Sequence, residues 1–117
     1  EKGVIVMAAE CWDGIPEHGQ FADLLKSADT PSSLLKSILS PGFRQQDQWQ
    51  AQVLAQILLK ADVYVHSGYL TEEILKSCFL KAAADLNTFL HSLSPKYHDR
   101  PRCCLLPEGP LTIPYVQ

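Results

Sequence analysis

The sequence predicts a layered α/β fold in which a small, mostly parallel sheet is flanked by helices. Residues 3–9, GVIVMAA, form a continuous apolar run, which is typical of a strand buried on both faces. Residues 46–60 show helical periodicity and run directly into a second apolar strand at residues 62–66. Helical segments separate the predicted strands, and this alternation favours right-handed crossovers and a parallel sheet.

Two short helices are expected between the first strand and residue 46. The first begins at Pro16, which suits a first helical turn, and continues to about Ala28. The second has Thr30 as its N-cap and Pro31 at its first position. It ends before residues 40–42, Ser-Pro-Gly, which break helices.

The stretch from residue 46 to 67 is the centre of the predicted fold. Trp49, Val53 and Ile57 recur at four-residue spacing and are expected to share the buried face of a helix. Val63 and Val65 are expected to be the core residues of the strand that follows.

After residue 67 the pattern predicts helices and then a third strand. Thr71 is expected to cap a short helix, and residues 79–93 are expected to continue helically because three consecutive alanines favour that state. The side chains expected to face inward from this helix are Leu86, Phe89, Leu90 and Leu93. Residues 102–106 read as a third strand and residues 107–110 break it. The order of elements predicts one three-layer, Rossmann-like domain over residues 1–117.

Composition restricts the possible partners. The net charge is −3 and the ten lysines and arginines are scattered, which argues against nucleic acid because phosphate binding needs concentrated positive charge. No apolar run approaches the roughly 18 residues of a membrane span, so no membrane partner is expected. The chain begins at Glu1 without methionine and enters a strand at once, so we expect it to be a piece of a longer chain.

The four cysteines are expected to be buried free thiols. Cys103 and Cys104 are adjacent in a predicted strand, where neighbouring side chains point to opposite faces and do not bridge. Cys11 and Cys78 lie in a predicted strand end and a predicted helix. Reduced thiols favour a reducing compartment, and we expect a cytoplasmic protein.

The loop after the first strand is the best candidate for ligand contact, because ligands bind at the carboxyl ends of parallel strands. Glu10 and Asp13 lie in this loop. Either carboxylate can orient a substrate hydroxyl, and either can instead cap neighbouring backbone N–H groups. Trp49 has two possible roles as well: a core residue, or a rim residue whose ring faces an aromatic cofactor.

Other functional signatures do not occur. The sequence contains neither of the glycine-rich motifs that hold nucleotide phosphates, and it shows no CxxC, HExxH or other metal-ligand spacing. His18, His91 and His98 are expected on the surface. His66 ends a strand, where it can carry a proton or simply have its hydrogen bonds satisfied, and we expect the second.

Three segments in this order resemble the C-terminal part of the nickel-pincer lactate racemase family: GVIVMAAECWDGIPEHGQF, DQWQAQVLAQILLKADVYVHS and CCLLPEGPLTIPYV. The resemblance spans nearly the whole chain. It implies a C-terminal α/β domain that, with an N-terminal catalytic domain, encloses a nickel pincer nucleotide derived from nicotinic acid. The family interconverts the configuration at C2 of a 2-hydroxy acid.

The resemblance also assigns roles. It implies that the two proton-carrying histidines, the cofactor-attaching lysine and the nickel ligand lie upstream, as does a Gln/Lys pair that holds substrate. No catalytic residue and no bound cofactor are therefore expected in this piece. The family tryptophan that lines the cofactor site corresponds to Trp49. Residues 15–18, Ile-Pro-Glu-His, depart from the usual glycine-rich stretch, which bears on loop conformation and substrate identity.

The leading hypothesis is thus the C-terminal domain of a lactate-racemase-like isomerase, inactive alone. The alternative is a non-catalytic α/β ligand-binding or interaction domain that kept the fold and lost the chemistry. The residues upstream of Glu1 discriminate between them. A nucleotide-binding domain is a third hypothesis, which the missing glycine fingerprint disfavours.

Overall fold

The structure, a computed structural model, describes residues 2–15, 18–97 and 102–111. Its elements are β1 (Gly3–Ala8), α1 (Phe21–Lys26), α2 (Pro31–Ile38), α3 (Gln48–Lys60), β2 (Ala61–His66), α4 (Glu72–Ser77), β3 (Lys81–Ala82), α5 (Leu86–Leu93) and two 3-10 turns, Pro95–Tyr97 and Gly109–Leu111. The chain forms two compact units, Glu1–Leu86 and Asn87–Gln117, and the sheet belongs to the first. The single domain expected over residues 1–117 stays a prediction.

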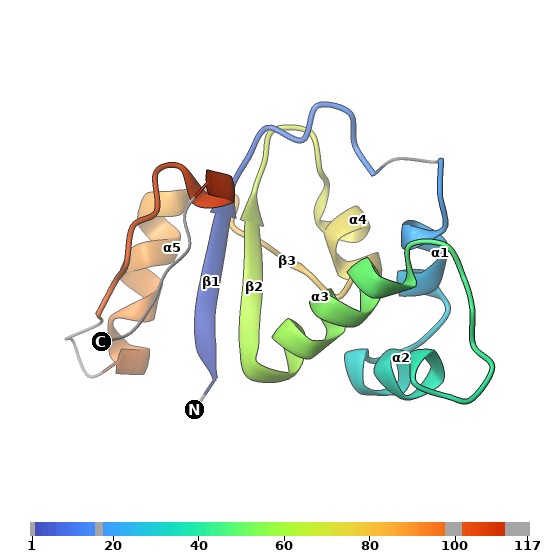
Figure 1. The fold of residues 1–117 in the computed structure, drawn as a ribbon. Coiled ribbons are helices and arrows are strands. Elements are labelled where there is room, and N and C mark those ends of the chain that lie inside the picture. The colour runs from blue at the N-terminus through green and yellow to red at the C-terminus, as the bar shows by residue number, and fades with distance from the viewer. Residues whose placement is uncertain (1, 16–17, 98–101, 112–117) are drawn as a thin grey trace. The chain divides into compact units, whose positions relative to one another are not determined.

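The three strands form a parallel sheet in the order β1-β2-β3 (Figure 1). All six residues of β1 pair with β2, so that Gly3 lies beside Ala61 and Ala8 beside His66. The ladder continues one residue further, where the Ala9 N–H donates to the His66 carbonyl at 3.0 Å. A small parallel sheet with flanking helices confirms the predicted α/β class.

The long helix α3 buries a different face from the one that the periodicity indicated. Trp49, Val53 and Ile57 do share one side of α3, but that side is 64%, 47% and 37% exposed. The buried residues of α3 are Ala51, Ala55 and Leu58. Small alanine side chains allow α2 and α1 to approach α3 closely, so the apolar core forms on the alanine side. That core contains Leu24, Leu25, Leu34, Ile38, Ala51, Ala55 and Cys78.

The predicted helix starts at Thr30 and Thr71 are confirmed. Thr30 accepts from the Ser33 N–H at 3.1 Å, and Ser33 Oγ accepts from the Thr30 N–H at 3.2 Å, which completes a capping box. Thr71 Oγ1 accepts from the Ile74 N–H at 3.3 Å. The expected helix over residues 16–28 covers only Phe21–Lys26 among the described residues, and Pro16 lies outside them.

The third strand was predicted in the wrong place. The expected helix over residues 79–93 is interrupted: Phe79 has φ 61°, which ends α4, and Lys81–Ala82 then pair with β2. Residues 102–106 are exposed and form no strand among the described residues. The side chains expected to face inward from α5 are not buried; Leu90 is 49% exposed, and Leu86, Phe89 and Leu93 are intermediate.

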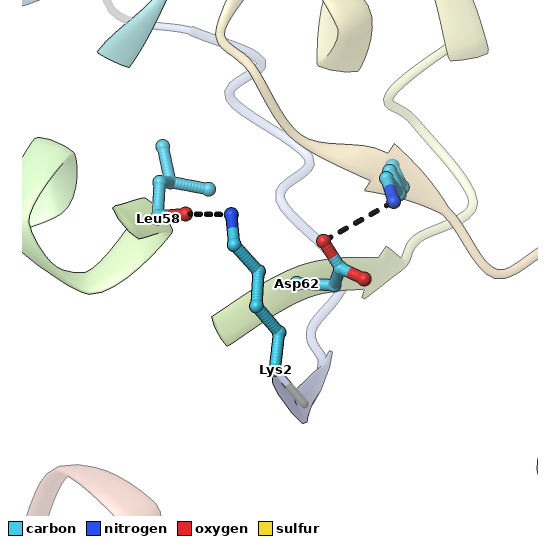
Figure 2. Close-up of polar contacts among 4 residues, drawn as sticks. Lys2, Leu58 and Asp62 are labelled. Carbon is cyan, nitrogen blue, oxygen red and sulfur yellow. Dashed lines mark hydrogen bonds and ion pairs between the residues drawn. The ribbon is translucent and has the colours of Figure 1, made fainter. Parts of the chain in front are cut away.

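Two lysine side chains link the sheet to α3 and two of its strands to each other (Figure 2). Lys2 Nζ donates to the Leu58 carbonyl at 2.9 Å, which places a cation at the negative end of α3. Lys81 Nζ lies 3.3 Å from Asp62 Oδ1 and so joins β3 to β2. The first contact joins the start of β1 to the last turn of α3, and the second joins β3 to β2 near its start.

The cysteines are free, as predicted, but mostly not buried. Cys78 is buried in the core, Cys11 is intermediate, and Cys103 and Cys104 are exposed. The latter two were expected inside a strand that does not form. In the described part of the chain, no helix is long and apolar enough to cross a membrane.

Candidate functional site

The candidate site is built on the loops that follow β1 and β2, at the carboxyl ends of these strands (Figure 1). Ser67 joins the two loops. Its Oγ donates to the Glu10 carbonyl at 2.5 Å and accepts from the N–H groups of Tyr69 at 3.1 Å and Leu70 at 3.3 Å. A single hydroxyl therefore satisfies three backbone groups and holds the two loops together.

The loop after β1 turns sharply and exposes a tryptophan. Cys11 has φ 52°, and the Gly14 N–H donates to the Cys11 carbonyl at 2.9 Å, closing a turn with Trp12 at its tip. Trp12 is 72% exposed, and Tyr69 in the loop after β2 is 62% exposed. Tyrosine and tryptophan are enriched at interfaces, because each joins an apolar ring to a polar group. The sequence analysis assigned no role to Tyr69. The feature that could have indicated one is its position, because it is an aromatic residue three positions after the end of a strand.

Glu10 and Asp13, the predicted ligand-facing carboxylates, are both exposed in this loop. Neither side chain makes a hydrogen bond to the residues that the structure describes, so the capping role that was their alternative is not seen there. Only the backbone carbonyl of Glu10 is engaged, by Ser67. Their contact with a ligand stays a prediction.

Trp49 lies in the first turn of α3, and it is not a core residue because 64% of it is exposed. Figure 1 shows α3 ending at the foot of β2, so its N-terminal end lies toward the carboxyl ends of the strands. The cofactor-lining role of Trp49 is compatible with this exposure and stays a prediction.

The start of α3 is anchored to the loop that precedes α1. Asp47 has φ 62°, and its Oδ2 accepts from the Gln20 N–H at 2.9 Å. Gly19 has φ 93°, and a Cβ there would meet Asp47 Oδ2 at 2.5 Å, so this approach requires glycine. A shallow hollow beside this contact is lined by His18, Gly19, Phe21, Gln46, Asp47 and Gln50. Trp49 does not line it.

His66 has the structural role that was expected. Its Nδ1 lies 2.7 Å from the Ala83 carbonyl, and since a carbonyl only accepts, Nδ1 is the donor. This bond connects the end of β2 to the residue after β3. His18 and His91 are exposed, as predicted, and His98 lies outside the described residues.

A second hollow lies beside β3, away from the predicted residues. It is lined by Tyr64, Glu72, Lys76, Phe79, Leu80, Lys81 and Ala82. Lys81 Nζ lies 5.4 Å from the Tyr64 ring centre and is paired with Asp62. Burial alone would lower the pKa of Lys81, but the hydrogen bond to Asp62 and the charges of Tyr64 and Asp62 outweigh it and raise the pKa.

Within residues 2–15, 18–97 and 102–111, no three side chains of His, Cys, Asp or Glu gather as a metal site would require. The loops at the carboxyl ends of β1 and β2 instead carry exposed aromatic rings and carboxylates, and hydrogen bonds of Ser67 hold these loops together.

Comparison with known proteins identifies the family. Residues 1–113 match the family described as the lactate racemase C-terminal domain. The chain is 33% identical over 111 residues to a lactate racemase of Thermoanaerobacterium thermosaccharolyticum, covering 93% of this chain and 26% of that protein. It also resembles the structure of the lactate racemase apoprotein from the same organism, with a TM-score of 0.68 and 34% identity over 81% of this chain and 23% of that one.

The chain therefore spans about a quarter of the length of the curated relative that it matches. The match of the family extends over nearly all of the sequence, from the first strand to beyond the second 3-10 turn. This chain belongs to the lactate racemase C-terminal domain family.

Proposed function

We propose that this chain is the C-terminal domain of a longer enzyme that interconverts the two configurations at C2 of a 2-hydroxy acid. The observation that carries the proposal is the family match over residues 1–113, together with 33% identity to a lactate racemase. The chain alone is expected to be inactive, because the resemblance assigns the proton-carrying histidines and the cofactor-attaching lysine to the N-terminal part of such an enzyme.

We propose that Trp49 lines the site of a nickel pincer nucleotide in the longer enzyme. Two features show how well the described residues suit this cofactor. The ring of Trp49 is 64% exposed and so available to stack on an aromatic cofactor, whereas the described residues provide no cluster that would hold nickel. We therefore expect this chain to form a wall of the cofactor site and the metal to be held by the rest of the protein. The cofactor, when bound, supplies the transient acceptor for the hydride from C2.

Glu10 and Asp13 are proposed as ligand-facing side chains on the same edge of the sheet. Both are exposed, and neither uses its carboxylate in a hydrogen bond to a described residue. A free carboxylate can accept a hydrogen bond from a substrate hydroxyl. The substrate's own carboxylate is repelled by them, so its charge must be bound by cations elsewhere in the enzyme.

The partner of this chain is proposed to be the N-terminal catalytic part of the same protein. The chain covers 26% of the lactate racemase relative, so most of such a protein lies outside these residues. Free thiols fit the proposed cytoplasmic location, where cysteines stay reduced.

The decisive experiment uses the full-length protein loaded with the nickel pincer cofactor. Each of a set of 2-hydroxy acids, with lactate first, is incubated with the protein in D2O. We expect loss of optical purity for at least one acid with the C2 hydrogen largely retained, because a hydrogen carried as hydride does not exchange with D2O. Retention of configuration throughout the set, in protein shown to carry cofactor, would contradict the proposal.

A non-catalytic interaction domain is the second candidate. The observation that favours it is the exposure of Trp12 and Tyr69, since aromatic side chains are enriched in protein interfaces. The sequence of the longer protein discriminates between the candidates. If it lacks the histidines and the cofactor-attaching lysine, the interaction domain is favoured.

A further inference from the structure

The serine that follows β2 uses all of the hydrogen-bonding capacity of its side chain. A serine hydroxyl has one donor and two acceptor positions. Ser67 Oγ donates to the Glu10 carbonyl at 2.5 Å and accepts from the N–H groups of Tyr69 at 3.1 Å and Leu70 at 3.3 Å. Since all three positions are occupied, this hydroxyl has none left for a ligand and acts only through the residues that it holds.

The bond from Ser67 to Glu10 lies where the pairing of β1 with β2 stops. The last backbone hydrogen bond of this ladder runs from the Ala9 N–H to the His66 carbonyl at 3.0 Å. One residue further along each strand, the Ser67 side chain provides the next link between the two segments. Among the described residues of the loops that follow β1 and β2, this is the only hydrogen bond that joins the two loops.

The backbone groups that Ser67 holds belong to residues whose side chains are exposed at the candidate site. Glu10 carries one of the proposed ligand-facing carboxylates, and Tyr69 is 62% exposed. One oxygen atom that binds the Glu10 carbonyl and the Tyr69 N–H fixes the spacing of the two loops, and so restricts where their side chains lie. None of these residues belongs to the apolar core, so loss of the hydroxyl is expected to loosen the loops without opening the core.

We propose that Ser67 is a positioning residue for substrate binding: its hydroxyl sets the spacing of Glu10 and Tyr69 and thereby the affinity of the enzyme for its 2-hydroxy acid. The inference rests on the proposed function, to which it adds a residue that the substrate does not touch. Loops that are already held in place lose less conformational freedom when a ligand binds. Since the chemistry at C2 is assigned to the N-terminal part, loss of the hydroxyl is expected to raise KM and to leave kcat nearly unchanged.

Steady-state kinetics of the full-length protein, loaded with the nickel pincer cofactor, tests the inference. The rate at which optical purity is lost is measured against the concentration of an acid that the wild-type protein racemises. We expect Ser67→Ala to raise KM about fivefold or more with kcat within about twofold of wild type, because the hydrogen bonds that order the loops are lost. Ser67→Thr keeps a hydroxyl and is expected to return KM to within about twofold of wild type.

Ser40→Ala is the matched control. Ser40 Oγ also donates to a backbone carbonyl, that of Ser37 at 2.6 Å, but it lies after α2 and outside the candidate site. We expect this variant to keep the KM and kcat of wild type, and an equal rise of KM in it would overturn the inference. If Ser67→Ala does not fold, Ser67→Cys takes its place with the same expected rise of KM, because a thiol is only a weak donor and acceptor.

Hydrogen exchange of the full-length protein without substrate tests the local contact separately from activity. We expect the amides of Tyr69 and Leu70 to exchange about tenfold faster or more in Ser67→Ala than in wild type, because they lose their acceptor. The Ala9 amide, which donates to the His66 carbonyl, is the internal control and is expected to exchange alike in both. Unchanged exchange at Tyr69 and Leu70 would overturn the inference, whether or not the protein is a racemase.

Failure of the proposed function gives a different result from failure of this inference. If the cofactor-loaded wild-type protein racemises no 2-hydroxy acid, the proposed function is overturned, and the inference that rests on it is overturned as well. If the wild type is active and Ser67→Ala loses stability or kcat while its KM is unchanged, the inference alone is overturned. A rise of KM that Ser67→Thr does not reverse also contradicts it, because the effect would then not depend on the hydroxyl.

Discussion

At the scale of single residues, exposure rather than residue type separates the candidate roles. Trp49 has the periodicity of a core residue, yet it is 64% exposed, and Ala51, two positions later, is fully buried. The functional argument for Trp49 therefore gains from the packing of α3 on its alanine side, because a residue that is not needed for the core is free to contact a ligand.

Replacing Trp49 tests this division of roles. In the full-length protein, Trp49→Ala is expected to weaken cofactor retention while it lowers the free energy of unfolding by less than about 1 kcal/mol, since an exposed side chain loses few contacts. Cofactor retention is measured as the cofactor that stays with the protein through gel filtration. The free energy of unfolding is measured by urea unfolding. Leu39→Ala, at an exposed apolar position after α2 and outside the candidate site, is the control. If the free energy of unfolding falls by about 3–5 kcal/mol while cofactor retention is unchanged, Trp49 packs in the interior of the full-length protein instead of lining the cofactor site.

Gly19 is the residue whose substitution is expected to disturb the backbone most directly. Gly19→Ala imposes φ 93° on a residue with a Cβ and brings that Cβ to 2.5 Å from Asp47 Oδ2. We expect a destabilisation of about 1–3 kcal/mol, measured by urea unfolding. Gly68→Ala is the control, because a Cβ there meets nothing within 4 Å. A similar small effect of both variants would show that the loop before α1 relaxes freely.

At the scale of elements, the junction of α3 with α2 and α1 depends on small side chains. Ala55 is 0% exposed, so Ala55→Leu is expected to separate these helices and cost about 1–3 kcal/mol in thermal unfolding. Gln56→Leu adds an apolar side chain of the same size at the adjacent exposed position and is expected to have little effect. Equal stability of the two variants would mean that the alanine contact is not tightly packed.

The contact between β2 and β3 predicts a dependence of stability on alkaline pH. The pKa of Lys81 is raised above its ordinary value of 10.5, so its pairing with Asp62 stabilises the protein below that value and is lost as the pH rises through the folded-state pKa. The pair is partly exposed, and we expect less than about 1 kcal/mol. Urea unfolding of the native protein and Asp62→Asn should differ near neutral pH and converge above the folded-state pKa. A difference that persists there would assign the effect of Asp62 to another contact.

At the scale of the whole molecule, the sequence correctly predicts the class of fold but not every strand. Residues 3–9 and 62–66 are long apolar runs, and their pattern alone indicates buried strands. β3 has only two residues and is separated from α4 by three, so it exists because Tyr64 and Val65 pair with it rather than because of its own composition. The apolar residues 103–106 lack such a neighbour among the described residues and form no strand.

The candidate site was predictable to a similar degree. Glu10 and Asp13 could be placed because a loop after a buried strand is a common ligand position. The joining role of Ser67 could not, since it depends on two loops 57 positions apart in the sequence. Trp49 came from the resemblance and its position in the first helical turn, whereas its exposure follows only from how α3 packs.

The cysteines provide a test of which parts of the chain are buried. Cys78 is buried in the core, whereas Cys103 and Cys104 are exposed. We therefore expect a thiol reagent to modify the latter two at least about tenfold faster than Cys78 under native conditions, because Cys78 reacts only after local opening. Mass spectrometry of the modified peptides provides the measurement. Equal rates would show that the core around Cys78 opens readily.

The loop between β1 and α1 is fastened at two points, by Ser67 at Glu10 and by Asp47 at Gln20. Its middle, residues 13–18, can therefore change in sequence while the points of attachment remain in place. We therefore expect relatives that differ in this segment to keep the two attachment points and to present different side chains at the carboxyl edge of the sheet. If this loop contacts the substrate as proposed, transplanting only residues 13–18 between relatives is expected to change the substrate preference while the two attachment points are kept.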